Sequence, residues 1–168
     1  GARFPLVERR SSSLDLDSVY GKGWGDAKIQ LNPTNGKFLI GDTIPAGGKA
    51  SIPGDLFRNF DKMAIIPEPR NEDNLIISQF HLLLQRFHNV VVDRITTVSK
   101  DDASIVFERA RDIVSHVFRV LTIADFLKNL ISAEVYSELI GKKKRYIRFP
   151  AGQPLPLEFT DAIYRFGH

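Results

Sequence analysis

The sequence contains no cysteine, and it has only one methionine and one tryptophan among its 168 residues. Without a thiol, neither a disulfide bond nor a thiolate-ligated metal site can form. Cysteine usage therefore does not indicate whether the protein works in an oxidising or a reducing compartment. The apolar mass comes from aliphatic side chains and twelve phenylalanines. A chain of this length is about the size of one globular domain, or of a piece of one.

Long hydrophobic runs are also missing. No run reaches the roughly 18 apolar residues that a membrane-spanning helix needs, and the first ten residues lack the apolar centre of a signal peptide. The chain is therefore expected to be soluble, with no membrane span. Its net charge is only +3, and apart from residues 142–145 its basic side chains are scattered, so nucleic acid is not an expected partner.

Glycine and proline are concentrated in residues 1–70, where apolar runs are few, which predicts a loop-rich N-terminal region. Within it, residues 28–31 and 37–40 flank the turn-rich segment 32–36. This pattern suits a small hairpin.

Helical periodicity dominates the rest of the chain, so the predicted fold class is mainly α. Apolar residues recur at helical spacing from residue 73 to about 97, which predicts a largely buried helix. Asn71, Glu72 and Asp73 place hydrogen-bond acceptors at its start.

A second helix is predicted over residues 101–121, with Asp101 and Asp102 in its first turn, where the helix dipole favours negative charge. Two shorter helices are predicted at residues 123–131 and 132–140, and Gly141 is expected to end the second of them. A final helix is predicted from about residue 157.

Since the sequence starts without methionine and still looks helical where it stops, both ends are expected to be cut from a longer protein.

Three groups of residues could carry chemistry. Ser11, Ser13, Asp15 and Asp17 alternate, so an extended loop would present their oxygen atoms on one side, as a hard cation such as Ca²⁺ requires. Taken alone, a solvated acidic turn explains this pattern better than a metal site.

The second group combines Arg70 with His81, Gln85 and His88, which share one stripe of the predicted helix. Two histidines seven residues apart could bind a metal, but hydrogen-bonded core histidines are the more common explanation. An arginine beside a cavity is a permanently charged donor that can stabilise developing negative charge.

The third group is residues 164–168, in which Gly167 precedes a histidine that could bind haem iron.

The order and spacing of these segments resemble those of animal-type haem peroxidases, the peroxidase–cyclooxygenase superfamily, and especially their cysteine-free bacterial relatives. Residues 10–21 are similar to the calcium loop of that family, and Arg70 stands eleven residues before His81, as its distal arginine does. The resemblance covers nearly the whole chain from about residue 10. It implies that residues 1–168 are part of one catalytic domain, with 1–70 as the calcium-loop region and 71–168 as the helical haem-pocket region.

The resemblance implies a role for each site residue. Ser11, Asp15 and Asp17 would bind calcium through their side chains and Ser13 through its carbonyl oxygen, while Arg70 would be the catalytic arginine that helps to split the peroxide O–O bond.

The haem-binding residues implied by the resemblance lie at two places in the chain. His168 would be the proximal ligand of the haem iron, and Arg165 would bind a propionate. Asp73 occupies the position of a glutamate that can form an ester with haem. Here the order is Glu72 then Asp73, and the aspartate side chain is shorter than that of the family's glutamate. Whether the ester with haem forms is therefore left undecided by the resemblance.

The resemblance therefore implies a haem b and calcium enzyme that reduces hydrogen peroxide through a ferryl intermediate and oxidises halide or small organic donors, with a role in the response to oxidative stress. The distal histidine segment of the family is absent from these residues, so the isolated fragment is expected to be inactive. One alternative is a fatty-acid dioxygenase of the same superfamily, although Arg165 and not a tyrosine stands three residues before His168. Another alternative is a non-catalytic module that binds haem or calcium. The sequence does not decide whether the bacterial parent protein is secreted.

Overall fold

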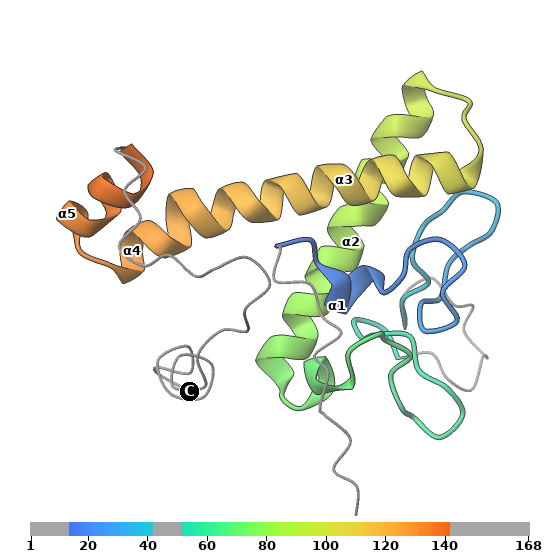
Figure 1. Ribbon diagram of the computed structural model, residues 1–168. Helices are drawn as coiled ribbons and strands as arrows, with labels where there is room; N and C mark the ends of the chain where they lie inside the picture. The colour runs from blue at the N-terminus through green and yellow to red at the C-terminus, as the bar shows by residue number, and fades with distance from the viewer. Residues whose placement is uncertain (1–13, 42–51, 142–168) are drawn as a thin grey trace, which may run out of the picture. The chain divides into compact units, whose positions relative to one another are not determined.

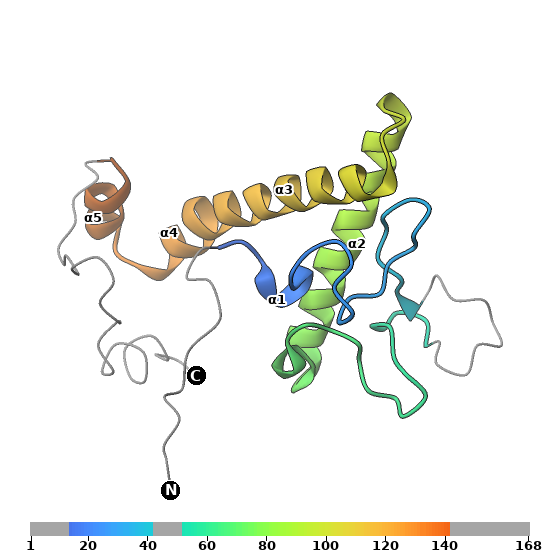
Figure 2. The ribbon, with the colours of Figure 1, turned by 45° about the vertical axis from the view of Figure 1, so that its right-hand side comes forward.

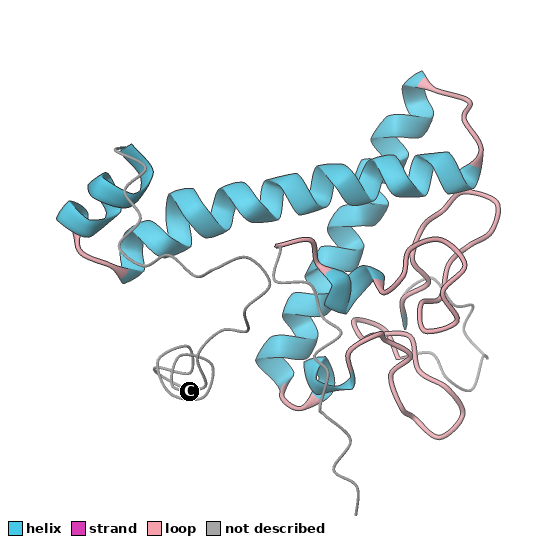
Figure 3. Ribbon diagram, viewed as in Figure 1, coloured by secondary structure: helices cyan, strands magenta, loops and turns pink. Residues whose placement is uncertain are grey.

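The computed structural model describes residues 14–41 and 52–141. These residues form helices joined by loops, with almost no strand, which confirms the prediction of a mainly α fold (Figure 3). The chain divides into two compact units, Gly1–Ile123 and Ala124–His168. None of the described helices combines the length and the apolar character that crossing a bilayer requires.

Two long helices, α2 (Leu75–Val98) and α3 (Ala103–Leu121), form the frame of the first unit and pack against each other (Figure 1). Both were predicted within two residues of their observed bounds. The N-cap of α2 is Asn74, whose side chain accepts a hydrogen bond from the backbone N–H of Ile77 at 3.0 Å. The acceptors expected at residues 71–73 therefore lie just outside the helix.

The start of α3 differs slightly from the prediction. Asp102 is the N-cap and makes no side-chain capping bond, and Asp101 lies before the helix, where it accepts a hydrogen bond from Arg109. Both carboxylates precede the first turn instead of lying within it. They still lie at the positive end of the helix dipole.

Only one stripe of α2 is buried, so the prediction of a largely buried helix is wrong for its other face. Leu75, Ile76 and Phe80 are exposed, and Ile76 retains 80% of its accessible surface. Helical spacing reveals apolar residues but does not say how many stripes find a partner. The buried stripe contains Ser78, His81, Leu82, Gln85, His88, Val91, Val92 and Ile95.

The loops before α2 lie along one side of it together with the short helix α1 (Asp17–Tyr20), which contacts α2 (Figure 2). The predicted hairpin is present in reduced form, as one antiparallel bridge between Leu31 and Phe38. Gly36 closes its turn with φ +77°, and a Cβ at this position would lie 2.7 Å from the carbonyl oxygen of Ala103. Glycine is therefore required here both by its conformation and by the close approach of α3.

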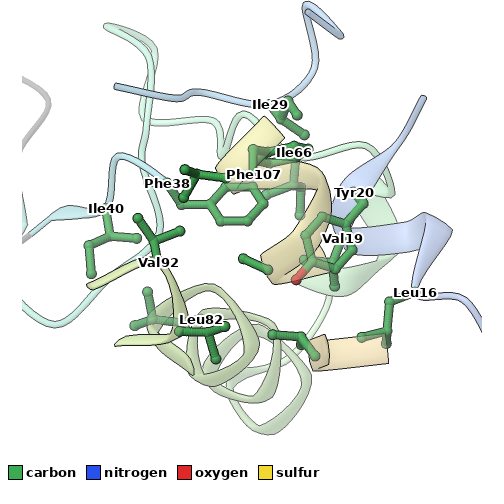
Figure 4. Close-up of a cluster of buried hydrophobic side chains, with 14 of the residues drawn as sticks. Leu16, Val19, Tyr20, Ile29, Phe38, Ile40, Ile66, Leu82, Val92 and Phe107 are labelled. Atoms are coloured by element: carbon green, nitrogen blue, oxygen red, sulfur yellow. The ribbon is translucent and has the colours of Figure 1, made fainter. Parts of the chain in front are cut away.

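The core of the first unit lies between these loops and the two long helices (Figure 4). Tyr20 and Phe38 come from the loop region, Leu82 and Val92 from α2, and Phe107 from α3. The loop-rich region therefore contributes directly to the core that fixes the candidate site.

Short helical segments make up the described part of the second unit, as the sequence predicted. A π-helical segment, η3 (Thr122–Leu127), leads into α4 (Lys128–Leu130). After Ser132, whose side chain caps the next helix, α5 (Ala133–Tyr136) continues as η4 (Ser137–Gly141). The helix predicted from about residue 157 lies outside the described residues.

Candidate functional site

Asp15 and Asp17 are half-buried and lie on either side of a sharp bend. Leu16 between them has a left-handed backbone conformation with φ 58° and ψ 36°, and Asp17 begins α1. The expectation of an extended loop is therefore wrong at this point. The backbone N–H of Asp17 donates to Oδ1 of Asp15 at 3.3 Å, so the bend brings the start of α1 onto the Asp15 carboxylate.

This bend is fixed to α3 through backbone carbonyls. Ser115 donates its hydroxyl to the carbonyl oxygen of Asp15 at 3.2 Å, and Nε of Arg119 donates to that of Leu14 at 2.9 Å. Sequence reasoning missed both anchors, since they join residues at least 100 positions apart. They hold the two acidic residues in place on the helical frame.

The chemistry of this bend fits a hard cation in part. Carboxylate oxygens are the ligands that Ca²⁺ prefers, but the ion usually takes six to eight oxygen atoms. The described residues contain no cluster of three or more His, Asp or Glu side chains that could hold a metal. The other predicted ligands, Ser11 and Ser13, lie outside the described residues. Of the four predicted calcium ligands, the structure therefore describes Asp15 and Asp17.

Arg70 lies in the 3-10 helix η2 (Pro69–Glu72), directly before α2. Its guanidinium group forms a two-point contact with Glu68, Nε to Oε1 at 2.9 Å and Nη2 to Oε2 at 3.0 Å. The Glu68 side chain is only 9% exposed, whereas that of Arg70 is 71% exposed. A buried carboxylate thus sets the direction of an exposed guanidinium, and this contact was not anticipated from the sequence.

The acidic residues after Arg70 have different environments. Glu72 forms an ion pair with Arg58 and accepts a hydrogen bond from the backbone N–H of Ala64 at 3.1 Å. Asp73, in contrast, ends η2 with an exposed side chain. Of the two carboxylates, Asp73 is therefore the one directed to the surface beside Arg70.

An exposed apolar face begins directly after Arg70 and Asp73. An exposed apolar surface suits the apolar ring of a porphyrin, and a guanidinium at its edge can donate hydrogen bonds to a group bound there. The described residues thus fit one side of a haem site. Arg165 and His168, the predicted propionate partner and axial ligand, lie outside them. The exposed apolar residues of this face are Leu75, Ile76, Ile77, Phe80 and Leu83.

His81 and His88 are core residues with hydrogen-bond partners, as the alternative to metal binding predicted. Nδ1 of His81 lies 2.9 Å from the amide nitrogen of Asn71, and its Nε2 lies 3.3 Å from that of Gln85. His81 thereby links α2 to the residue that follows Arg70. Burial lowers the pKa of each histidine to about 4, so both rings are neutral at neutral pH.

His88 and Asn89 bind the loop region to α2. The His88 ring contacts Tyr20 through Nδ1 at 3.2 Å and the carbonyl oxygen of Gly36 through Nε2 at 3.1 Å. The Asn89 side chain accepts from the backbone N–H of Phe38 at 2.7 Å and donates to its carbonyl oxygen at 2.9 Å. The adjacent pair therefore fixes both α1 and the reduced hairpin.

The animal haem peroxidase family model matches residues 5–168. The chain belongs to the animal haem peroxidase family. Among curated proteins, thyroid peroxidase of Sus scrofa is 27% identical over 94 residues, which are 55% of this chain and 10% of that protein. The chain thus spans about a tenth of the length of this relative. No solved structure matches it.

Membership of the animal haem peroxidase family confirms the resemblance drawn from the sequence at the level of the family and its helical fold. The roles of individual residues stay predictions. The structure brings Arg70 and Asp73 together next to the apolar face of α2, and it places Asp15 and Asp17 on the bend anchored to α3.

Proposed function

We propose that this chain is part of a haem- and calcium-dependent peroxidase, which reduces hydrogen peroxide and oxidises a halide or a small organic donor. The observation that carries the proposal is the exposed guanidinium of Arg70, directed by buried Glu68 at the edge of the exposed apolar face of α2. Family membership supports it.

Haem, when bound, would supply the electrons for peroxide reduction. His168 would hold its iron, and Arg165 would pair with a propionate. Asp73 is the carboxylate available for an ester link, because Glu72 is engaged by Arg58 and Ala64.

Arg70 would donate hydrogen bonds to the peroxide oxygen that carries negative charge away as the O–O bond breaks. Its guanidinium stays protonated throughout, so it stabilises charge without transferring a proton. Glu68 keeps this group in a fixed direction, which reduces the reorganisation needed during the reaction. Asp15 and Asp17 would share a calcium ion, since two neighbouring carboxylates repel each other unless a cation lies between them.

The test is the reaction of the holoprotein with hydrogen peroxide, followed by stopped-flow absorbance. Arg70→Ala is expected to lower the rate by about 10²–10³-fold at unchanged haem content, as loss of one such donor typically does. Arg94→Ala, on the exposed side of α2, is the matched control and should react at the normal rate. A normal rate for Arg70→Ala would refute the role of Arg70.

The haem assignment is tested separately through His168→Ala, which is expected to lose the Soret band or to shift it towards that of weakly bound haem. Failure of the full-length protein to bind haem would overturn the proposed function as a whole. Oxygenation of an unsaturated fatty acid, without oxidation of halide or organic donors, would instead favour the dioxygenase.

A further inference from the structure

Tyr20 and His88 form a buried polar pair inside the aromatic core of the first unit. Tyr20, at the end of α1, has no accessible surface, and its hydroxyl lies 3.2 Å from Nδ1 of His88. The rings of Phe38 and Phe107 lie 5.7 Å and 5.9 Å from the Tyr20 ring, centroid to centroid. Figure 4 shows the Tyr20 ring among these apolar side chains.

The direction of the hydrogen bond in this pair is fixed by the backbone. Nε2 of His88 lies 3.1 Å from the carbonyl oxygen of Gly36, which can only accept a hydrogen bond. Nε2 therefore carries the hydrogen, and in a neutral imidazole Nδ1 is then an acceptor. The ring is neutral at neutral pH because burial lowers its pKa to about 4. The Tyr20 hydroxyl is consequently the donor of the hydrogen bond to Nδ1 of His88.

This arrangement matters for the oxidation of Tyr20. Burial raises the pKa of the phenol, so the phenolate is not accessible as the form to be oxidised. Loss of an electron alone would leave a buried phenol radical cation with the guanidinium carbon of Arg111 only 5.7 Å from the ring centroid, which is costly. If the proton moves to His88 at the same time, the radical is neutral, and both N–H groups of the imidazolium have acceptors, the phenoxyl oxygen and the Gly36 carbonyl.

We infer that Tyr20 and His88 form a one-electron oxidation site. One electron leaves the phenol for a one-electron oxidant, its O–H bond breaks, and an N–H bond forms at Nδ1 of His88. The products are a neutral tyrosyl radical, a histidinium ion and an oxidant reduced by one electron. Haem activated by peroxide would be the natural oxidant, and in this respect the inference rests on the proposed function.

Trp24 provides a route from this pair towards solvent. The residue is 38% exposed, and its ring makes an edge contact with Phe107 at 5.7 Å between centroids, while Phe107 also contacts Tyr20. An aromatic donor such as a phenol, bound at Trp24, would return an electron to the tyrosyl radical and lose its own hydroxyl proton to solvent, and the proton held by His88 would return to the Tyr20 oxygen.

A test independent of haem uses the 168-residue chain and flash oxidation by photo-generated ruthenium(III) tris(bipyridine). Replacing Tyr136, Tyr146 and Tyr164 by Phe leaves Tyr20 as the only tyrosine. High-field electron paramagnetic resonance is expected to show a tyrosyl radical with a hydrogen-bond-shifted g tensor and coupling to one exchangeable deuteron in D₂O. Further replacement of Tyr20 by Phe should remove the signal.

His88→Leu in the same background should lower the radical yield by about 10²-fold, as loss of a positioned proton acceptor does. His116→Leu, at an exposed histidine of α3, is the matched control. Trp24→Phe should slow reduction of the radical by an added phenol. If His88→Leu does not fold, the g tensor and the deuteron coupling of the Tyr20-only chain still decide the matter.

Absence of a tyrosyl signal from the Tyr20-only chain, a radical without the hydrogen-bond signature, or an unchanged yield in folded His88→Leu would each overturn the inference. Failure of the full-length protein to bind haem would refute the proposed function but leave this result unaffected.

Discussion

At the scale of single residues, His81 and His88 make the stability of the fold dependent on pH. Burial lowers both pKa values to about 4 from the ordinary value of 6.5. Below about pH 6.5 the unfolded chain binds protons that the folded chain excludes, so the free energy of unfolding falls as the pH drops towards 4. Since one pKa unit corresponds to about 1.4 kcal/mol, the two histidines together should cost several kcal/mol at pH 4.

Urea unfolding of the 168-residue chain at a series of pH values between 7.5 and 4 measures this dependence. His116→Gln, which changes an exposed histidine, should leave the slope unaltered. The double variant His81→Gln/His88→Gln should be less stable at pH 7.5 but should lose most of the slope. A free energy of unfolding that is constant over this range for the unsubstituted chain would contradict the burial of neutral histidines.

At the scale of elements, the Asn89 side chain joins α2 to the reduced hairpin. Asn89→Ala removes both partners of the Phe38 backbone, at 2.7 Å and 2.9 Å, and leaves a backbone N–H and a carbonyl in a largely buried environment. Each unsatisfied group costs about 1–3 kcal/mol. We therefore expect a lower melting temperature and faster amide hydrogen exchange across residues 30–40.

Gln79→Ala is the matched control for this prediction. Gln79 is an exposed amide on the same helix, and its one bond to a loop carbonyl, that of Gly54, is 3.3 Å long. Its removal should change stability by less than about 0.5 kcal/mol, as is usual for surface substitutions. Equal effects of the two substitutions would show that the Asn89 contact does not hold the hairpin.

At the scale of the whole molecule, the calcium predicted at Asp15 and Asp17 should stabilise the entire first unit. The bend is tied to α3 by Ser115 and Arg119, and α1 continues from it to the core residue Tyr20. A ligand bound only by the folded state adds about 2.7 kcal/mol at a concentration of 100 times its Kd. Removing calcium should thus lower the melting temperature of the holoprotein by several degrees.

Differential scanning calorimetry with and without a calcium chelator measures this effect. In Asp15→Asn, the chelator is expected to change the melting temperature much less than in the unsubstituted protein. Asp61→Asn, at an exposed loop position, should respond to the chelator normally. A melting temperature of the unsubstituted holoprotein that the chelator leaves unchanged would exclude a structural calcium ion.

The sequence by itself determined the positions of the two long helices to within two residues, and the family. Helical periodicity is a local signal, so it needs no knowledge of packing. The family resemblance rested on the order and spacing of several short segments, among them residues 10–21 and the segment from Arg70 to His81, and these can be read along the sequence without knowledge of packing. The sequence predicted helix at Thr122–Leu127 but not its π-helical form, since the spacing of apolar residues does not distinguish an α-helical turn from a π-helical turn.

Tertiary structure alone decided which stripe of α2 is buried and which partners the polar residues have. Tyr20 and His88 are 68 positions apart, and Asp15 and Ser115 are 100 apart, so no periodicity connects them. Glu68 is close to Arg70 in the sequence, yet its burial comes from the surrounding fold. The physical reason is that local propensities fix helices, whereas the pairing of buried polar groups depends on contacts that form only when distant segments pack together.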